Sequence, residues 1–153
     1  MPTPDAAAQF VEDFALALSQ IGFPRMPARV FTAALAAPEE SLTARELAER
    51  LQVSPAAISG AVRYLSQLNL IRRTRVRGER VDRFGLGDDV WTPVFEAEIA
   101  AYGPLSRLCA RALDGEGLSE RGRDRVGETK DFLEFMAEEM EGLVERWRTL
   151  RRR

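Results

Sequence analysis

The stretch Thr43-Ala-Arg-Glu-Leu-Ala-Glu-Arg-Leu51, then Gln52-Val-Ser54, then Pro55-Ala-Ala-Ile-Ser-Gly-Ala-Val-Arg-Tyr-Leu65 decides the fold of this chain. Thr43 and Glu46 have the spacing of a capping box, and Ser54-Pro55 places a capping hydroxyl before a proline. These signals predict two helices, 43–51 and 55–68, joined by a tight turn. Two helices in this arrangement place the second one for entry into the major groove of DNA.

A run of arginines follows the second helix, in Ile71-Arg-Arg-Thr-Arg-Val-Arg-Gly-Glu-Arg-Val-Asp-Arg-Phe84. We predict two strands, 72–77 and 80–84, around a turn near Gly78. Since alternate residues of a strand share a face, one group of arginines is expected to project together, and another arginine lies at the tip, where it would enter the minor groove. The group is Arg73, Arg75 and Arg77, and the tip residue is Arg80. Alternatively, this is an edge hairpin kept soluble by its charge, and an internal Asp82–Arg83 ion pair is expected to shape it.

Charge is distributed unevenly along the chain. Residues 60–83 hold seven arginines against two carboxylates, whereas all 153 residues together carry a net charge of −2. This polarity indicates one face that meets a polyanion and an acidic surface elsewhere. On the second helix, the side opposite the apolar stripe carries small residues, which permit a close approach to base edges, and one arginine that could reach a guanine or a phosphate. These residues are Ala56, Ala57, Ser59, Gly60 and Arg63. The alternative is a solvated face of an alanine-rich protein.

The composition argues against several other functions. The chain has one cysteine, Cys109, and no histidine, which excludes a disulfide within the chain and most zinc, haem and Cys/His nucleophile sites. We therefore expect no catalytic residues, no metal and no cofactor, and not an enzyme. No apolar run of 18 residues and no signal peptide are present, so we expect no membrane partner and a cytoplasmic location.

Long helices are predicted on both sides of the arginine-rich segment. A first helix ends near Gly22, and a second spans 27–36. Asp88-Asp89 is expected to cap a helix from 90 to 113, in which Tyr102-Gly-Pro104 is either a kink or an interruption. The last helix, 119–150, carries apolar residues spaced alternately by three and four, which predicts a seam against a second copy of the chain. The seam consists of Leu133, Met136, Met140, Leu143, Trp147 and Leu150.

Four aromatic residues follow one another where the arginine-rich segment joins the terminal helices. They are Phe84, Trp91, Phe95 and Tyr102. They either line a pocket for a small-molecule effector, including a cage for a quaternary ammonium ion, or pack the two lobes together.

The order of these elements resembles the MarR superfamily of bacterial transcription regulators, and its GbsR-like branch in particular. The matching segments are 42–51, 53–65, Leu70-Ile-Arg-Arg73 and Gly78-Glu-Arg-Val-Asp-Arg-Phe84. The resemblance implies that Thr43 binds a phosphate, that Arg80 and Arg83 serve the wing, and that the first and last two helices intertwine in the dimer, the first through Phe10 and Phe14. It also implies that the groove is contacted by Ser54, Ala56, Ala57, Ser59 and Arg63. The usual wing pattern, Asp-x-Arg-Arg with a following Leu-Thr, is replaced here, and GbsR-like members are associated with choline or osmoprotectant control.

The sequence thus predicts a mainly α protein with a small β-wing, a winged helix-turn-helix with long dimerisation helices at both ends. We expect an N-terminal dimerisation helix (1–22), a DNA-binding domain (23–87) and a helical dimerisation region (88–153). The expected function is a transcription regulator that binds a pseudo-palindromic operator on double-stranded DNA as a homodimer, a repressor relieved by a small-molecule effector. The alternative is a winged-helix module for protein–protein contact with no specific DNA site.

Overall fold

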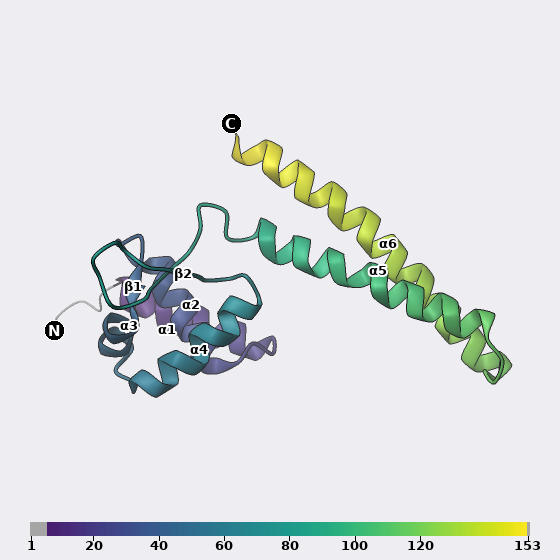
Figure 1. Ribbon diagram of the computed structural model, residues 1–153, viewed down its shortest axis with the longest axis horizontal. Coiled ribbons are helices and arrows are strands. Elements are labelled where there is room, and N and C mark those ends of the chain that lie inside the picture. The colour runs from purple at the N-terminus through teal and green to yellow at the C-terminus, as the bar shows by residue number, and fades with distance from the viewer. Residues whose placement is uncertain (1–5, 153) are drawn as a thin grey trace. The chain divides into compact units, whose positions relative to one another are not determined.

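The computed structural model of the chain describes residues 6–152, which form six helices and three short strands (Figure 1). The mainly helical fold with a small sheet is as predicted. The first five residues of the predicted 1–22 helix lie outside the described range. The elements are α1 (Ala6–Gln20), α2 (Arg25–Ala36), β1 (Leu42–Thr43), α3 (Ala44–Leu51), α4 (Pro55–Gln67), β2 (Arg72–Thr74), β3 (Arg83–Gly85), α5 (Thr92–Asp114) and α6 (Glu120–Arg151).

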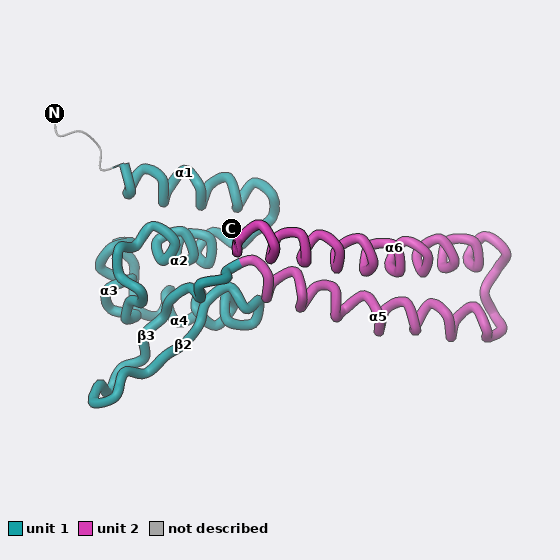
Figure 2. Tube along the Cα trace, turned by 90° about the horizontal axis from the view of Figure 1, so that it is seen from above, with its two compact units in different colours: residues 1–90 teal, residues 91–153 magenta. Residues whose placement is uncertain are grey.

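The chain divides into two compact units, residues 1–90 and residues 91–153 (Figure 2). In the first unit, α2 packs against α1, α3 and α4, and the sheet lies beside α3. The core of this unit consists of side chains that are almost fully buried: Val30, Phe31, Leu42, Leu47, Ile58 and Leu65. Arg29 ties three helices together, because its guanidinium donates to Glu12 of α1 at 2.7 Å and to the Leu51 carbonyl of α3 at 3.1 Å.

The predicted ends of the two central helices are confirmed. The Thr43 hydroxyl accepts from the Glu46 amide at 3.2 Å, and the Glu46 carboxylate accepts from the Thr43 amide at 2.6 Å, so both halves of the capping box are present. The Ser54 hydroxyl accepts from the Ala57 amide at 3.3 Å. Asn69 has a φ of +58°, as expected for the residue that ends α4 in the left-handed conformation.

The sheet is antiparallel in the order β1-β3-β2, and Phe84 lies opposite both Leu42 and Arg73. The predicted strands 72–77 and 80–84 are too long. The ladder covers only Arg72–Thr74 and Arg83–Gly85, because beyond them the hairpin extends past β1 and the helical core that anchor its base. Gly78 has a φ of +96° in the loop, consistent with the predicted turn.

The second unit is an antiparallel hairpin of α5 and α6 (Figure 1). The prediction that Asp88-Asp89 caps α5 is wrong. Trp91 occupies the cap position and Pro93 lies in the first turn, where its missing N–H leaves no bond unmade. Pro104 lies inside α5, and the helix continues through it to Asp114. The buried Ser106 hydroxyl donates to Glu134 of α6 at 2.7 Å and fixes the register of the two helices.

Candidate nucleic-acid interface

The outer face of α4 is open and lined by small residues. Ile58, Ala61, Val62 and Leu65 are buried against the core, whereas the other side of the helix is exposed or half-buried. A side-chain carbon added at Gly60 would meet nothing within 4 Å, so no packing requires glycine there. This face can approach a duplex closely, since no large side chain protrudes before Arg63. It contains Ala56, Ala57, Ser59, Gly60 and Arg63.

The two capping residues differ in their remaining capacity to bind phosphate. The Thr43 hydroxyl accepts from the Glu46 amide and also lies 3.0 Å from the Glu46 carboxylate, to which it donates. The amide of Thr43 lowers the pKa of the Glu46 carboxyl, and the Thr43 hydroxyl adds to this effect, so a carboxylate occupies the place where the resemblance puts a phosphate. Ser54 is exposed and uses only its oxygen lone pair in the cap, which leaves its O–H for DNA.

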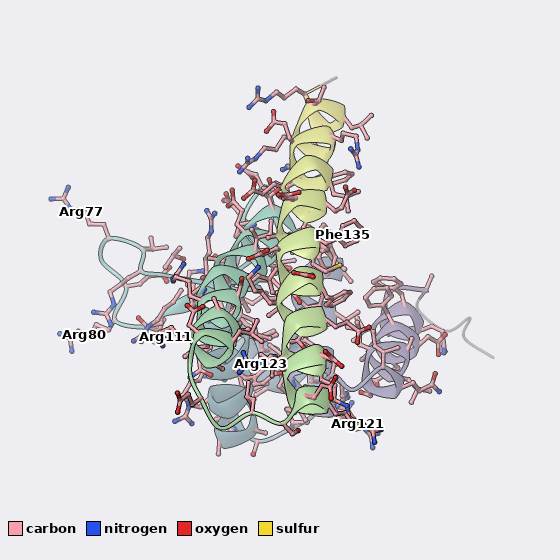
Figure 3. The ribbon with its side chains drawn as sticks, turned by 90° about the vertical axis from the view of Figure 1, so that its right-hand side faces the viewer. Arg77, Arg80, Arg111, Arg121, Arg123 and Phe135 are labelled. Atoms are coloured by element: carbon pink, nitrogen blue, oxygen red, sulfur yellow. The ribbon has the colours of Figure 1, made fainter. Side chains whose placement is uncertain are left out.

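Arg77 and Arg80 extend from the tip of the β2–β3 hairpin into solvent (Figure 3). Within residues 6–152, neither guanidinium has a hydrogen-bond or ion-pair partner. Both charges are thus available to phosphates without the loss of an internal contact. Arg63, on the outer face of α4, likewise has no partner among the described residues.

Arg73 and Arg75 are held by a carboxylate of the same hairpin. Both donate to Asp82, Arg75 at 3.0 Å. The hydrogen bond from Arg73, followed by that from Arg75, lowers the pKa of the Asp82 carboxyl. Asp82, which directly precedes β3, meets Arg73 and Arg75 across the hairpin, whereas Arg83 binds Ser41. The expected Asp82–Arg83 ion pair is therefore wrong.

Arg83 points toward the body of the first unit and is only 21% exposed. Its guanidinium donates to the hydroxyl and the carbonyl of Ser41, at 3.1 and 2.9 Å. It also lies 3.7 Å from Glu46 at the start of α3 and 3.6 Å from Glu79 in the wing loop. Arg83 thus joins the wing to the segment that begins the helix-turn-helix, and these contacts occupy the group that the resemblance assigns to DNA.

The predicted seam on α6 forms one stripe of the helix, but its residues differ in burial. Met140 is buried, and Leu133 and Met136 are half-buried, whereas Leu143, Trp147 and Leu150 are exposed. The neighbour of Leu143, Val144, is buried instead, because α5 covers the Met140–Val144 side of α6.

Sequence reasoning missed other exposed apolar residues of the second unit. Phe135 is 57% exposed and points away from α5 (Figure 3), and Phe132 is exposed to a similar extent. Leu105 and Leu108 form an exposed pair on α5. The only sequence signal for Phe132 and Phe135 is that each stands one position before a seam residue. On α1, exposed Phe10 stacks on half-buried Phe14, with ring centroids 5.3 Å apart.

Two of the four aromatic residues expected to line an effector pocket do so. Between α5 and α6 lies a cavity of about 320 Å³, here called the α5–α6 pocket, whose lining is almost wholly apolar. Phe84 is buried in the core of the first unit instead, as a partner of Leu42 in the sheet. Tyr102 lies outside the lining, and its hydroxyl donates to Glu98 at 3.3 Å. The pocket is lined by Trp91, Thr92, Phe95, Leu143, Val144 and Trp147.

Residues 6–152 contain neither a cluster of metal ligands nor a membrane-spanning helix. No group of three or more acidic, cysteine or histidine side chains is arranged to hold a metal ion there. None of the helices in that range combines the length and the apolar character needed to cross a membrane.

Two family models match the chain, and together they cover both units. One, described as MarR family, matches residues 21–80, and the other, an MmpR5-like MarR family transcriptional regulator, matches residues 89–151. No curated protein matches the chain significantly.

Solved structures are also similar to the chain. A crystal structure described as a transcriptional regulator is 26% identical, with a TM-score of 0.82 over 94% of this chain and 98% of that one. MepR, a transcription regulator of the Staphylococcus aureus multidrug efflux pump MepA, is 20% identical, with a TM-score of 0.43 over 80% and 83% of the two chains. The adhesin competence repressor AdcR from Streptococcus pyogenes is 21% identical, with a TM-score of 0.41 over 84% and 91%.

Proposed function

Because this chain belongs to the MarR family of winged-helix transcription regulators, and is not an enzyme, we propose that it is a repressor that binds a pseudo-palindromic operator as a homodimer. The observation that carries the proposal is the contrast on the first unit between an open, small-residue face of α4 and two unpaired arginines at the wing tip. The face of α4 suits base edges in a major groove, and the wing-tip arginines suit phosphates or a minor groove.

Within this proposal the arginines have different tasks. Arg63, Arg77 and Arg80 contact DNA directly, since their charges are unpaired among the described residues. Arg73 and Arg75 stay on Asp82 and keep the hairpin straight, and Arg83 orients the wing relative to α3. Ser54 binds phosphate at the start of α4, while Thr43 acts through its cap.

The homodimer is proposed from the apolar surface left exposed on three helices. Phe10 of α1, Leu105 and Leu108 of α5 and Phe135 and Leu150 of α6 are each more than 40% exposed. Apolar side chains left exposed on the helices of each unit are typical of an interface between subunits. A two-fold dimer presents two copies of α4, which fits an operator made of inverted half-sites.

Repression would be relieved by a small-molecule effector that binds better to a dimer with wrongly spaced recognition helices. The α5–α6 pocket is the proposed effector site. Membership of the GbsR-like branch remains a prediction, since the model that matches the C-terminal helices is MmpR5-like. A regulator of chromosomal DNA would act in the cytoplasm.

The proposal is tested by selecting bound duplexes from a random DNA library with the purified protein near physiological salt. We expect an inverted repeat with half-sites roughly 10 base pairs apart, which would agree with both the dimer and the operator. Salt-dependent binding with no preferred sequence would contradict the operator and favour the alternative, a winged-helix module for protein–protein contact.

A further inference from the structure

We propose that the α5–α6 pocket binds a neutral, predominantly apolar small molecule, and that this is the chemical class of the effector. The inference rests on the function proposed above. It differs from the class implied by the GbsR-like resemblance, which would place a quaternary ammonium ion among the aromatic rings.

The depth of the pocket favours a small molecule as its occupant. Thr92 and Val144 are 5% and 8% exposed, whereas Trp91, Phe95, Leu143 and Trp147 are between 39% and 55% exposed. The first two therefore form a floor and the other four a rim. The pocket is open on its rim side, and its volume of about 320 Å³ falls at the lower end of the range of small-ligand sites.

The charges around the pocket favour a neutral occupant. Arg148 follows Trp147 and forms ion pairs with Glu96, the neighbour of Phe95, and with Glu145 at 3.6 Å. This cluster keeps a net charge of −1, but none of its three charged groups belongs to the lining of the pocket. A cation in the pocket would lose its hydration without meeting a carboxylate in the lining, and an anion would meet no cationic group there; apart from the two indole N–H groups, the hydroxyl of Thr92 is the polar group among the lining side chains.

The three aromatic rings of the lining do not by themselves favour a cation as the ligand. Trp91, Phe95 and Trp147 would offer their faces to an ammonium ion, but they also bury apolar surface equally well. No carboxylate stands in the lining beside the rings to hold an ammonium ion, and Arg148, which follows the lining residue Trp147, binds Glu96. The apolar lining therefore favours a neutral ligand over a quaternary ammonium ion.

The experiment uses the two tryptophans as reporters. They are the only tryptophans of the chain, and both line the pocket, so tryptophan emission reports on the proposed site alone. The full-length protein is titrated with three optically silent probes of similar shape: cyclohexylmethanol, cyclohexanecarboxylate and cyclohexyltrimethylammonium. We expect saturable emission changes with the alcohol, and at least tenfold weaker binding of both ions.

A matched pair of substitutions separates apolar contact from cation–π attraction. Phe95→Leu removes a ring of the lining but keeps its apolar character, and Phe132→Leu makes the same change on α6 outside the pocket. Neither substitution should lower the affinity for the alcohol more than about threefold. Binding of the quaternary ion as tight as that of the alcohol, lost in Phe95→Leu only, would overturn the neutral class.

The remaining outcomes distinguish this proposal from the proposed function. Emission that depends on protein concentration but not on any probe would assign the pocket to a second copy of the chain, and would overturn the proposal. Operator binding that persists while the alcohol saturates the emission change would remove the effector role from this pocket. Specific operator binding without any response to the probes would leave the regulator intact and reject the ligand site.

Discussion

Replacing Arg80 at the wing tip with alanine should weaken binding to every duplex by a similar factor and reduce its salt dependence. The Arg80 side chain extends into solvent without a partner among residues 6–152, so its whole charge is available to one phosphate (Figure 3). Each phosphate neutralised contributes about 0.9 to the slope of log affinity against log salt. Arg80→Ala should therefore reduce the slope by about one, and the affinity ratio of wild type to variant should fall roughly 3.5-fold between 50 and 200 mM salt.

The measurement is a fluorescence-anisotropy titration of a labelled operator and of an unrelated duplex at four salt concentrations. Arg73→Ala is the matched control from the same hairpin, because the Arg73 guanidinium is bonded to Asp82. We expect its slope to change by less than half as much. Equal slope changes in the two variants would refute the argument that internal pairing removes an arginine from the interface, and an unchanged slope in Arg80→Ala would remove the tip from it.

Four further changes have defined outcomes. Arg63→Ala should cost on the order of 1–3 kcal/mol of operator binding and relax specificity at one base pair, measured by titrating single-base operator variants. Thr43→Ala removes the hydroxyl half of the α3 cap, leaves the backbone N–H that binds Glu46, and should lower the free energy of unfolding by about 1 kcal/mol, seen as an earlier urea midpoint with an unchanged slope. Phe135→Glu should convert the dimer to monomers in sedimentation velocity, since a charge would enter the exposed strip of α6. The pKa of the Asp82 carboxyl in the folded protein lies below its ordinary value of 3.8, so the ion pairs of Asp82 stabilise the fold above the unfolded-state pKa, and this stabilisation is lost as pH falls through the folded-state pKa. In Arg73→Gln, the pKa of Asp82 measured by carboxyl NMR should rise.

The features predicted well from the sequence depend on residues close together in the chain. The capping box needs only Thr43 and Glu46, and the end of α4 needs only a residue that tolerates a positive φ, which Asn69 supplies. Three- and four-residue spacings of apolar residues likewise predict helices, because a helix turns once in 3.6 residues. The order of the elements, and with it the fold, follows from such local signals.

The tasks of the wing arginines could not be predicted in this way. Along the sequence, Arg75, Arg80 and Arg83 are equivalent members of one basic run. What separates them is their surroundings: a carboxylate across the hairpin for the first, open solvent for the second and Ser41, 42 residues away, for the third. An internal hydrogen bond of this kind occupies the donors of an arginine without any trace in the local pattern of the sequence.

The last helix shows why a seam of apolar residues can be recognised before its partner is known. Residues spaced by three and four lie on one stripe of a helix, and α5 buries Met140 and Val144 on that stripe. Within residues 6–152, Leu143 lines the α5–α6 pocket beside Val144, and α5 leaves open a strip of α6 that includes Phe132, Phe135 and Leu150. A helix of 32 residues is about 48 Å long, and leaving such a strip in water along it would be costly. A second copy of the chain supplies a strip of equal length, which is why we assign this open strip of α6 to the dimer. Only the α5–α6 pocket is assigned to a ligand.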